Sequence, residues 1–159
     1  MKFTYQLRNR QLLQFRILIG LGILLNIIYL LGQTMALFNY EFTVSIGLQE
    51  PSSEITNVGV ALNKGFGLGD TIFYMPLFLI GIIGLIKRTD VGLYAMIGAM
   101  AITVYWPIVC LSTLFFAKGS PGWHFSDYTN YLCMLSIIAL YGIWALYFLY
   151  QNRSKLVKN

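Results

Sequence analysis

The sequence predicts an all-α integral membrane protein, a bundle of four transmembrane helices, from its composition and from the spacing of its charges. The 159 residues are 57% hydrophobic and only 11% charged, whereas soluble domains carry about 25% charged residues. A soluble domain of this length could not bury so much apolar side chain, because its surface is too large for its volume. The composition therefore excludes a soluble globular protein, a disordered chain and a nucleic-acid-binding module.

The charged residues leave four uncharged apolar stretches between them. The predicted spans are 15–38, 71–86, 91–117 and 129–150. Each is near the length of about 20 residues that an α-helix needs to cross ~30 Å of hydrocarbon. Their continuous apolar runs fit helices and lack the in-and-out alternation of barrel strands. We expect a single membrane domain, 1–159, whose loops 39–70 and 118–128 lie on the same side.

The basic residues predict the orientation of this bundle. They cluster in 1–16, in the turn 87–90 and after residue 151, whereas 39–70 is acidic overall. Cytoplasmic segments are enriched in Lys and Arg, so we expect both termini in the cytoplasm and the plasma (cytoplasmic or inner) membrane as the location. The basic tails would contact anionic lipid, and nothing else in the sequence indicates nucleic acid.

The first outer loop carries a pattern typical of strands. Apolar and polar residues alternate over 42–49 and again over 58–63, and the segment Glu50-Pro51-Ser52-Ser53-Glu54 between them has turn composition. Period-two alternation on both sides of a turn predicts a β-hairpin. We expect this hairpin to lie over the outer face of the bundle.

Polar residues inside the predicted spans are candidates for a functional site. Asn26, Tyr29 and Gln33 are spaced i, i+3, i+7 and therefore share one helix face. Two interpretations remain open: hydrogen bonds to a neighbouring helix, or the lining of a polar cavity. Trp106 precedes Pro107 near mid-membrane, far from the interface that Trp prefers, and is either a packing residue or a ligand contact.

Asp70 follows the glycine-rich segment 64–69 and also has two interpretations. As the N-cap of a helix that begins at residue 71, it would only satisfy backbone N–H groups. If the helix instead begins near Phe66, Asp70 lies within the bilayer, where an acid is a functional-site candidate. The sequence leaves both possibilities open.

The second outer loop and the two cysteines offer little chemistry. His124 and Asp127 are spaced i, i+3 and could touch, but a single histidine excludes a bis-His haem or a His-rich zinc site. We predict no catalytic residues, no metal and no cofactor. Cys110 and Cys133 fall at similar depths in their helices, so they are either a disulfide or two small buried residues.

Three functional hypotheses follow. The first is a non-enzymatic subunit or accessory protein of a membrane assembly. It would bind a partner protein or a second copy through 42–62 and through small-residue helix faces such as Ala95, Ala99 and Thr103. The second is an oligomeric carrier or pore for a small solute or ion. Its predicted lining is Asn26, Tyr29, Gln33, Asp70 and Trp106. The third is an outer-leaflet enzyme that uses His124, Asp127 and Asp70.

Overall fold

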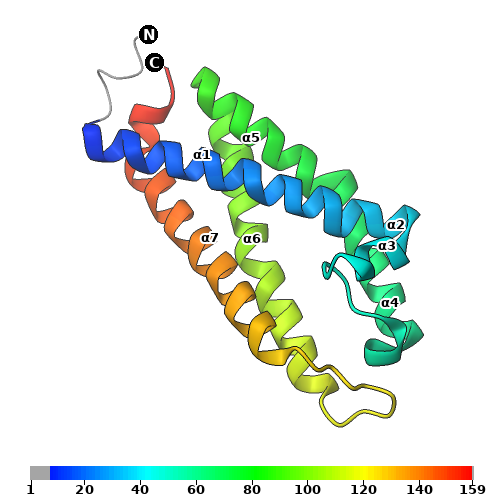
Figure 1. Ribbon diagram of the computed structural model, residues 1–159. Coiled ribbons are helices and arrows are strands. Elements are labelled where there is room, and N and C mark those ends of the chain that lie inside the picture. The colour runs from blue at the N-terminus through cyan, green and yellow to red at the C-terminus, as the bar shows by residue number, and fades with distance from the viewer. Residues whose placement is uncertain (1–7, 159) are drawn as a thin grey trace.

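The computed structural model describes residues 8–158, and these residues form helices without any strand (Figure 1). Several helices follow one another without a break, and two of the segments, η2 and η3, are π-helical. In chain order the elements are α1 Asn9–Tyr29, η2 Leu30–Thr34, α2 Met35–Phe38, α3 Tyr40–Ser45, α4 Ser52–Gly69, η3 Asp70–Tyr74, α5 Met75–Lys87, α6 Asp90–Ala117 and α7 Tyr128–Leu156.

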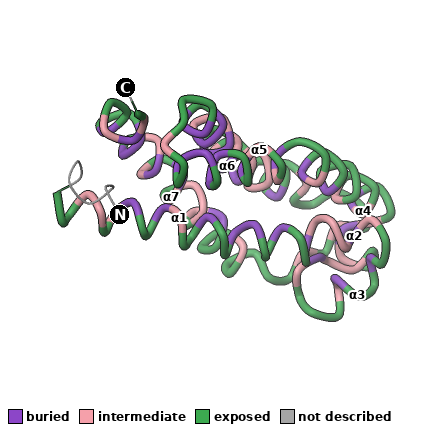
Figure 2. The backbone as a smooth tube through the Cα atoms, turned by 90° about the horizontal axis from the view of Figure 1, so that it is seen from above, coloured by how far each residue is buried: buried purple, intermediate pink, exposed green. Residues whose placement is uncertain are grey.

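Four helical runs are long and apolar enough to cross a membrane, which confirms the predicted number of spans. They are Asn9–Phe38, Ser52–Lys87, Asp90–Ala117 and Tyr128–Leu156. Buried and exposed residues alternate along the helices (Figure 2), and large apolar residues such as Ile80 and Leu140 are exposed. By the length and composition of its helices the chain is a multi-pass membrane protein.

The predicted β-hairpin in 39–70 is wrong. The short helix α3 and the longer helix α4 occupy most of this segment, and α4 continues through η3 into α5. The helix α4 has one break, at Thr56, whose φ is 65°; after it the buried residues Gly59 and Gly67 are eight apart, which is helical spacing. A helix satisfies its own backbone, whereas a two-stranded ribbon would leave its edges unpaired beside the hydrocarbon. The second span therefore begins at Ser52 rather than near residue 71.

Helices α5 and α6 form a tight antiparallel pair through small residues. A Cβ atom added at Gly92 would collide with the backbone of Gly84, so the two helices touch there. The turn between them is fixed by Thr89, whose Oγ1 accepts a hydrogen bond from the Gly92 N–H at 3.1 Å and donates one to the Gly84 carbonyl at 3.2 Å. Farther along α6, Ala95 and Ala99 are buried within the chain as well.

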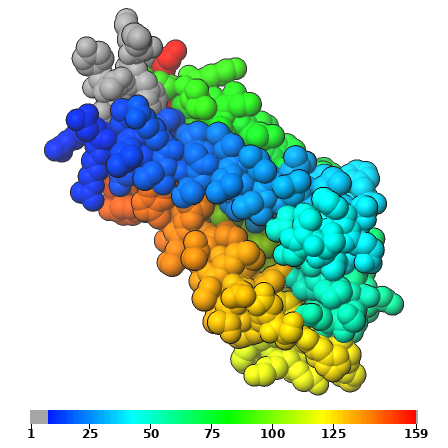
Figure 3. All heavy atoms as spheres, viewed as in Figure 1, coloured from blue at the N-terminus to red at the C-terminus, as the bar shows by residue number. Residues whose placement is uncertain are grey.

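Eight of the ten described Lys and Arg residues gather at one end of the bundle, which we call the basic end (8–16, 87–90 and 152–158). The Arg88 guanidinium donates hydrogen bonds to the carbonyls of Lys155 and Val157 at 3.2 and 3.1 Å. The Gln11 amide donates to Asn152 Oδ1 at 2.7 Å. The start of α1, the α5–α6 turn and the end of α7 are therefore neighbours. Helix α1 runs from this end across the face of the molecule, between α5 and α7 (Figure 3).

Candidate functional site

The two π-helical segments lie against each other, η2 toward the end of the first span and η3 near the middle of the second. The hydroxyl oxygens of Thr34 in η2 and Thr71 in η3 are 2.8 Å apart and share a hydrogen bond. One turn earlier, a Cβ atom at Gly67 would come within 2.6 Å of the Gln33 carbonyl oxygen, so a glycine is required at this contact. Short π-helical segments are frequent at functional sites. They contain Gln33 and Asp70, two of the polar residues singled out in the sequence.

Aromatic residues from three helices meet beside these segments. The ring of Tyr29 packs edge-on against Tyr74, with centroids 5.0 Å apart, and against Trp106, with centroids 5.6 Å apart. The Tyr74 hydroxyl shares a 2.7 Å hydrogen bond with the hydroxyl of Thr103 on α6. Tyr29 and Trp106, predicted as cavity residues from different helices, are thus in contact.

Asp70 lies inside a continuous helix and is only 6% exposed, so it is not the N-cap of a helix that begins at residue 71. Its Oδ2 atom is buried without a hydrogen-bond partner. Asp70 is close enough to Tyr29 and Tyr74 to interact with them electrostatically. A buried polar atom without a partner is costly, which makes Asp70 a candidate for a functional role rather than a structural one.

Four more buried polar atoms from the predicted set lack partners. They are Asn26 Oδ1, the Tyr29 hydroxyl, Gln33 Oε1 and the indole nitrogen of Trp106. Asn26 uses its amide nitrogen to donate to the Gly22 carbonyl of its own helix at 3.1 Å, so the predicted interhelical hydrogen bond of Asn26 is not formed. The polar face of α1 therefore supplies hydrogen-bonding capacity that the described part of the chain leaves unused.

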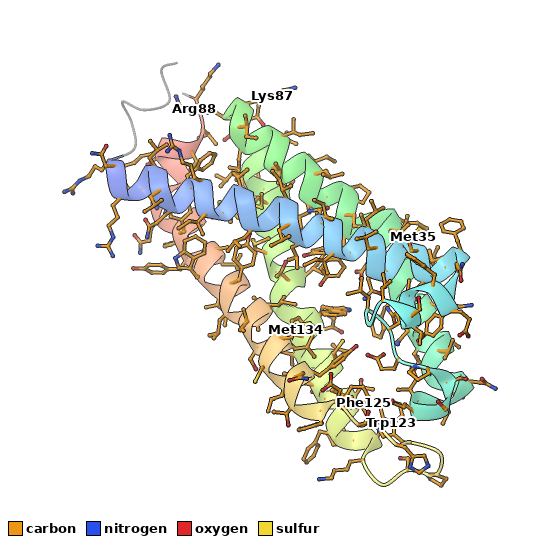
Figure 4. The ribbon with its side chains drawn as sticks, viewed as in Figure 1. Met35, Lys87, Arg88, Trp123, Phe125 and Met134 are labelled. Atoms are coloured by element: carbon orange, nitrogen blue, oxygen red, sulfur yellow. The ribbon has the colours of Figure 1, made fainter. Side chains whose placement is uncertain are left out.

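A cavity of about 400 Å³ lies in the half of the molecule away from the basic end. It is bounded by α1 and η2, by 47–50, by α4, α6 and α7, and by the α6–α7 loop (118–127). Figure 4 shows Trp123, Phe125 and Met134, three of its lining residues, along the α6–α7 loop and α7. Most of the lining is apolar or aromatic, and includes Leu25, Ile28, Leu62, Phe66, Leu114, Tyr131 and Ile138.

Of the seven predicted site residues, the cavity brings together four. Tyr29, Gln33, Trp106 and Asp127 line it. Asn26 and Asp70 are buried next to this lining without belonging to it, and His124 is exposed on the α6–α7 loop.

The wall formed by 47–50 is held by a polar network that sequence reasoning missed. The Asn63 amide of α4 donates to Gln49 Oε1 at 2.8 Å and to Glu50 Oε2 at 3.1 Å. The Gln49 amide donates to the Gly32 carbonyl of η2 at 3.2 Å. Glu50 Oε1 is buried without a partner, and burial raises the pKa of this carboxyl. The sequence presented Glu50 only as part of a turn.

The α6–α7 loop is fastened to the start of α4 by Glu54. The Glu54 carboxylate accepts hydrogen bonds from the Ser126 N–H at 3.3 Å and from its hydroxyl at 3.2 Å, and the Glu54 carbonyl accepts from the His124 N–H at 2.8 Å. Asp127 accepts instead from Asn130 at 2.6 Å. The possible contact between His124 and Asp127 is not among the hydrogen bonds of the described residues; the loop is held by Glu54 and Ser126, which are too far apart in sequence for any pattern to reveal.

The two cysteines are free thiols, so the possible disulfide is not formed. Cys110 lines the cavity, whereas Cys133 is exposed on α7. Within residues 8–158, no group of three or more His, Cys, Asp or Glu side chains could hold a metal ion.

The fold and this site define a helical multi-pass membrane protein with a mostly apolar cavity between its helices. No protein-family model, no curated protein and no solved structure matches the chain.

Proposed function

We propose that the protein is a membrane-embedded binding protein, of the carrier class, for a small amphipathic molecule. The observation that carries this proposal is the cavity of about 400 Å³, apolar over most of its lining, with a few polar atoms at defined places. Ligand sites typically combine such a lining with a small number of polar groups that orient the ligand. The trapped polar atoms of Gln33 and Trp106 at the cavity are suited to that role.

We further propose that the basic end faces the cytoplasm of the plasma membrane. The supporting argument is the enrichment of Lys and Arg in cytoplasmic segments, together with the position of all three basic segments at one end. The cavity then lies in the outer half of the membrane and receives its ligand from outside the cell or from the outer leaflet.

A carrier fits this arrangement better than a pore. Below the cavity the bundle is closed, because Leu18, Leu85 and Leu149 are fully buried there. The Tyr141 hydroxyl also donates to the Leu18 carbonyl at 2.9 Å and joins α7 to α1. The lining residues of the cavity come from several helices of a single chain. Release toward the cytoplasm would require the helices of the closed half to rearrange.

The other two hypotheses gain no support from specific contacts. The accessory-subunit hypothesis relied on an outer β-hairpin, whereas α4 of that segment faces the cavity of its own chain. The enzyme hypothesis relied on His124 and Asp127, which are not paired. Both stay predictions that rest on the sequence alone.

The test uses the purified protein in phosphatidylcholine nanodiscs and three small amphiphiles that share one alkyl chain: 1-octanol, octyl sulfate and octyltrimethylammonium. A ligand that binds only the folded state raises the unfolding temperature. We expect at least one of them to do so by several degrees. Replacing Ile138, which lines the cavity, by Trp should abolish the shift. Ile137→Trp should preserve it, because Ile137 is 67% exposed on the same helix. Equal shifts in both variants, or none in the wild type, would refute the proposal.

A further inference from the structure

The cavity lining contains acidic side chains and, among the described residues, no basic ones. Glu50 and Asp127 belong to its lining, whereas the lining drawn from the described residues includes no Lys, Arg or His. Glu50 has one carboxylate oxygen bound by Asn63 and the other buried without a partner. The nearby Lys64 ammonium lies over the Tyr40 ring, 5.6 Å from its centroid, rather than in the cavity.

Aromatic rings surround the same space. Near Asp127, Phe125 stacks on Trp123 with centroids 6.4 Å apart and packs edge-on against Tyr131 at 4.9 Å. At the other end of the cavity lie Tyr29 and Trp106. The face of an aromatic ring carries negative electrostatic potential and attracts organic cations, most strongly where water is excluded. The rings and the two carboxylates therefore both favour a positively charged ligand.

Ligands of other charge fit less well. An anion would face two carboxylates with no positive side chain to accept it, a repulsive arrangement of the kind that excludes ligands. A neutral amphiphile with a hydroxyl group can donate a hydrogen bond to the buried Glu50 oxygen, but it leaves the charge of the ionised carboxylate unbalanced. A cation with an apolar body both balances that charge and fills the apolar lining.

We propose that the ligand of this cavity is an amphiphilic organic cation, an ammonium group on an apolar chain or ring. Its charged group lies beside Glu50 and the aromatic rings, and its apolar body lies along Leu25, Ile28 and Ile138. This inference rests on the proposed function, since it names the chemical class of the molecule that the site binds.

The experiment measures the affinity of the same nanodiscs for octyltrimethylammonium, with 1-octanol and octyl sulfate as neutral and anionic probes. We expect the cation to bind at least tenfold more tightly than octyl sulfate. Glu50→Gln keeps the hydrogen-bond acceptor for Asn63 and removes the charge. This variant should bind the cation about tenfold more weakly than the wild type does, and its affinity for 1-octanol should stay within twofold of the wild-type value. Glu41→Gln, the same change at an exposed residue outside the cavity lining, should alter neither affinity by more than twofold.

A second pair of variants tests the aromatic rings independently of Glu50. Tyr131→Leu keeps the apolar surface and removes the ring, and should lower the affinity for the cation about threefold. Tyr128 lies one turn earlier and outside the lining, so Tyr128→Leu should leave the affinity for the cation unchanged. Tighter binding of 1-octanol or octyl sulfate than of the cation, or equal effects of Glu50→Gln and Glu41→Gln, would overturn the cation inference and leave the proposed function standing. Failure of all three probes to bind would refute the proposed function itself.

Discussion

The two halves of the bundle are filled in different ways. Near the basic end, the interior consists of fully buried side chains such as Leu18, Leu85, Met96 and Leu149, and α5 and α6 touch through glycine. In the other half, the helices diverge around a cavity, and polar atoms such as Asp70 Oδ2 are buried without partners. Tight packing supplies most of the stability of a protein interior, so the packed half stabilises a fold in which the open half can carry unsatisfied groups.

The same substitution should therefore have unequal effects in different parts of the molecule. Gly92→Ala places a methyl group into the backbone of Gly84 and Leu85, so α5 and α6 must separate. We expect a loss of about 3 kcal/mol in the free energy of unfolding, measured by SDS titration in mixed micelles. Gly20→Ala is the matched control, because a Cβ at Gly20 meets nothing within 4 Å, and it should change stability by less than about 1 kcal/mol. Equal effects would show that the contact between α5 and α6 does not support the fold.

The sequence predicted the spans and the basic end better than it predicted the open half. The spacing of charges predicted four spans, and the positions of Arg8, Lys87 and Arg153 predicted one basic end, because both depend only on the cost of placing charge in hydrocarbon. The same reasoning singled out Tyr29, Gln33 and Trp106, since polar groups within a span need a partner or a function.

The open half depends on contacts between distant segments, and local patterns could not predict it. In 58–63 the apolar positions fit a strand, but the buried Gly59 and Gly67 also fit a helix, and α4 packs against η2 where Gly67 meets Gln33. The π-helical segments arise where Gly67 meets Gln33 and Thr34 meets Thr71. The roles of Glu50 and Glu54 come from partners on other elements, so composition suggested only a turn.

Truncating a leucine should sharpen the comparison. Leu149 is fully buried in the packed half, whereas Leu62 is 53% exposed and borders the cavity. An unfolded state that stays in the membrane surrounds leucine with lipid, so mainly packing contacts are lost. We expect Leu149→Ala to cost about 2 kcal/mol and Leu62→Ala less than about 0.5 kcal/mol in the same titration. A Leu62→Ala variant as unstable as Leu149→Ala would mean that the cavity collapses around its lining and is not a preformed site.

The smallest expected effect is a dependence of stability on pH that originates in the open half. Burial raises the pKa of Glu50, so the folded state holds this proton more tightly than the unfolded state does. Its titratable neighbours are Tyr40 on α3, Glu54 on α4 and Cys110 on α6, and none of them is a cation that would oppose the shift. Stability from this group is therefore fully present below the ordinary glutamate pKa of about 4.3 and is lost as the pH rises through the raised folded-state value.

Glu50→Gln tests this directly, because the amide cannot titrate. The variant should be more stable than the wild type at pH 7 and should lose the part of the pH slope that lies above pH 4.3, as measured by thermal unfolding in nanodiscs at a series of pH values. Glu41→Gln should keep the wild-type slope, since Glu41 is exposed. If an organic cation occupies the site, it stabilises the ionised form of Glu50, so adding octyltrimethylammonium should flatten the wild-type slope and leave that of Glu50→Gln unchanged. If stability depended on pH in the same way in Glu50→Gln and Glu41→Gln, the titrating group would be a residue other than Glu50. Glu50 would then not supply the charge of the cavity.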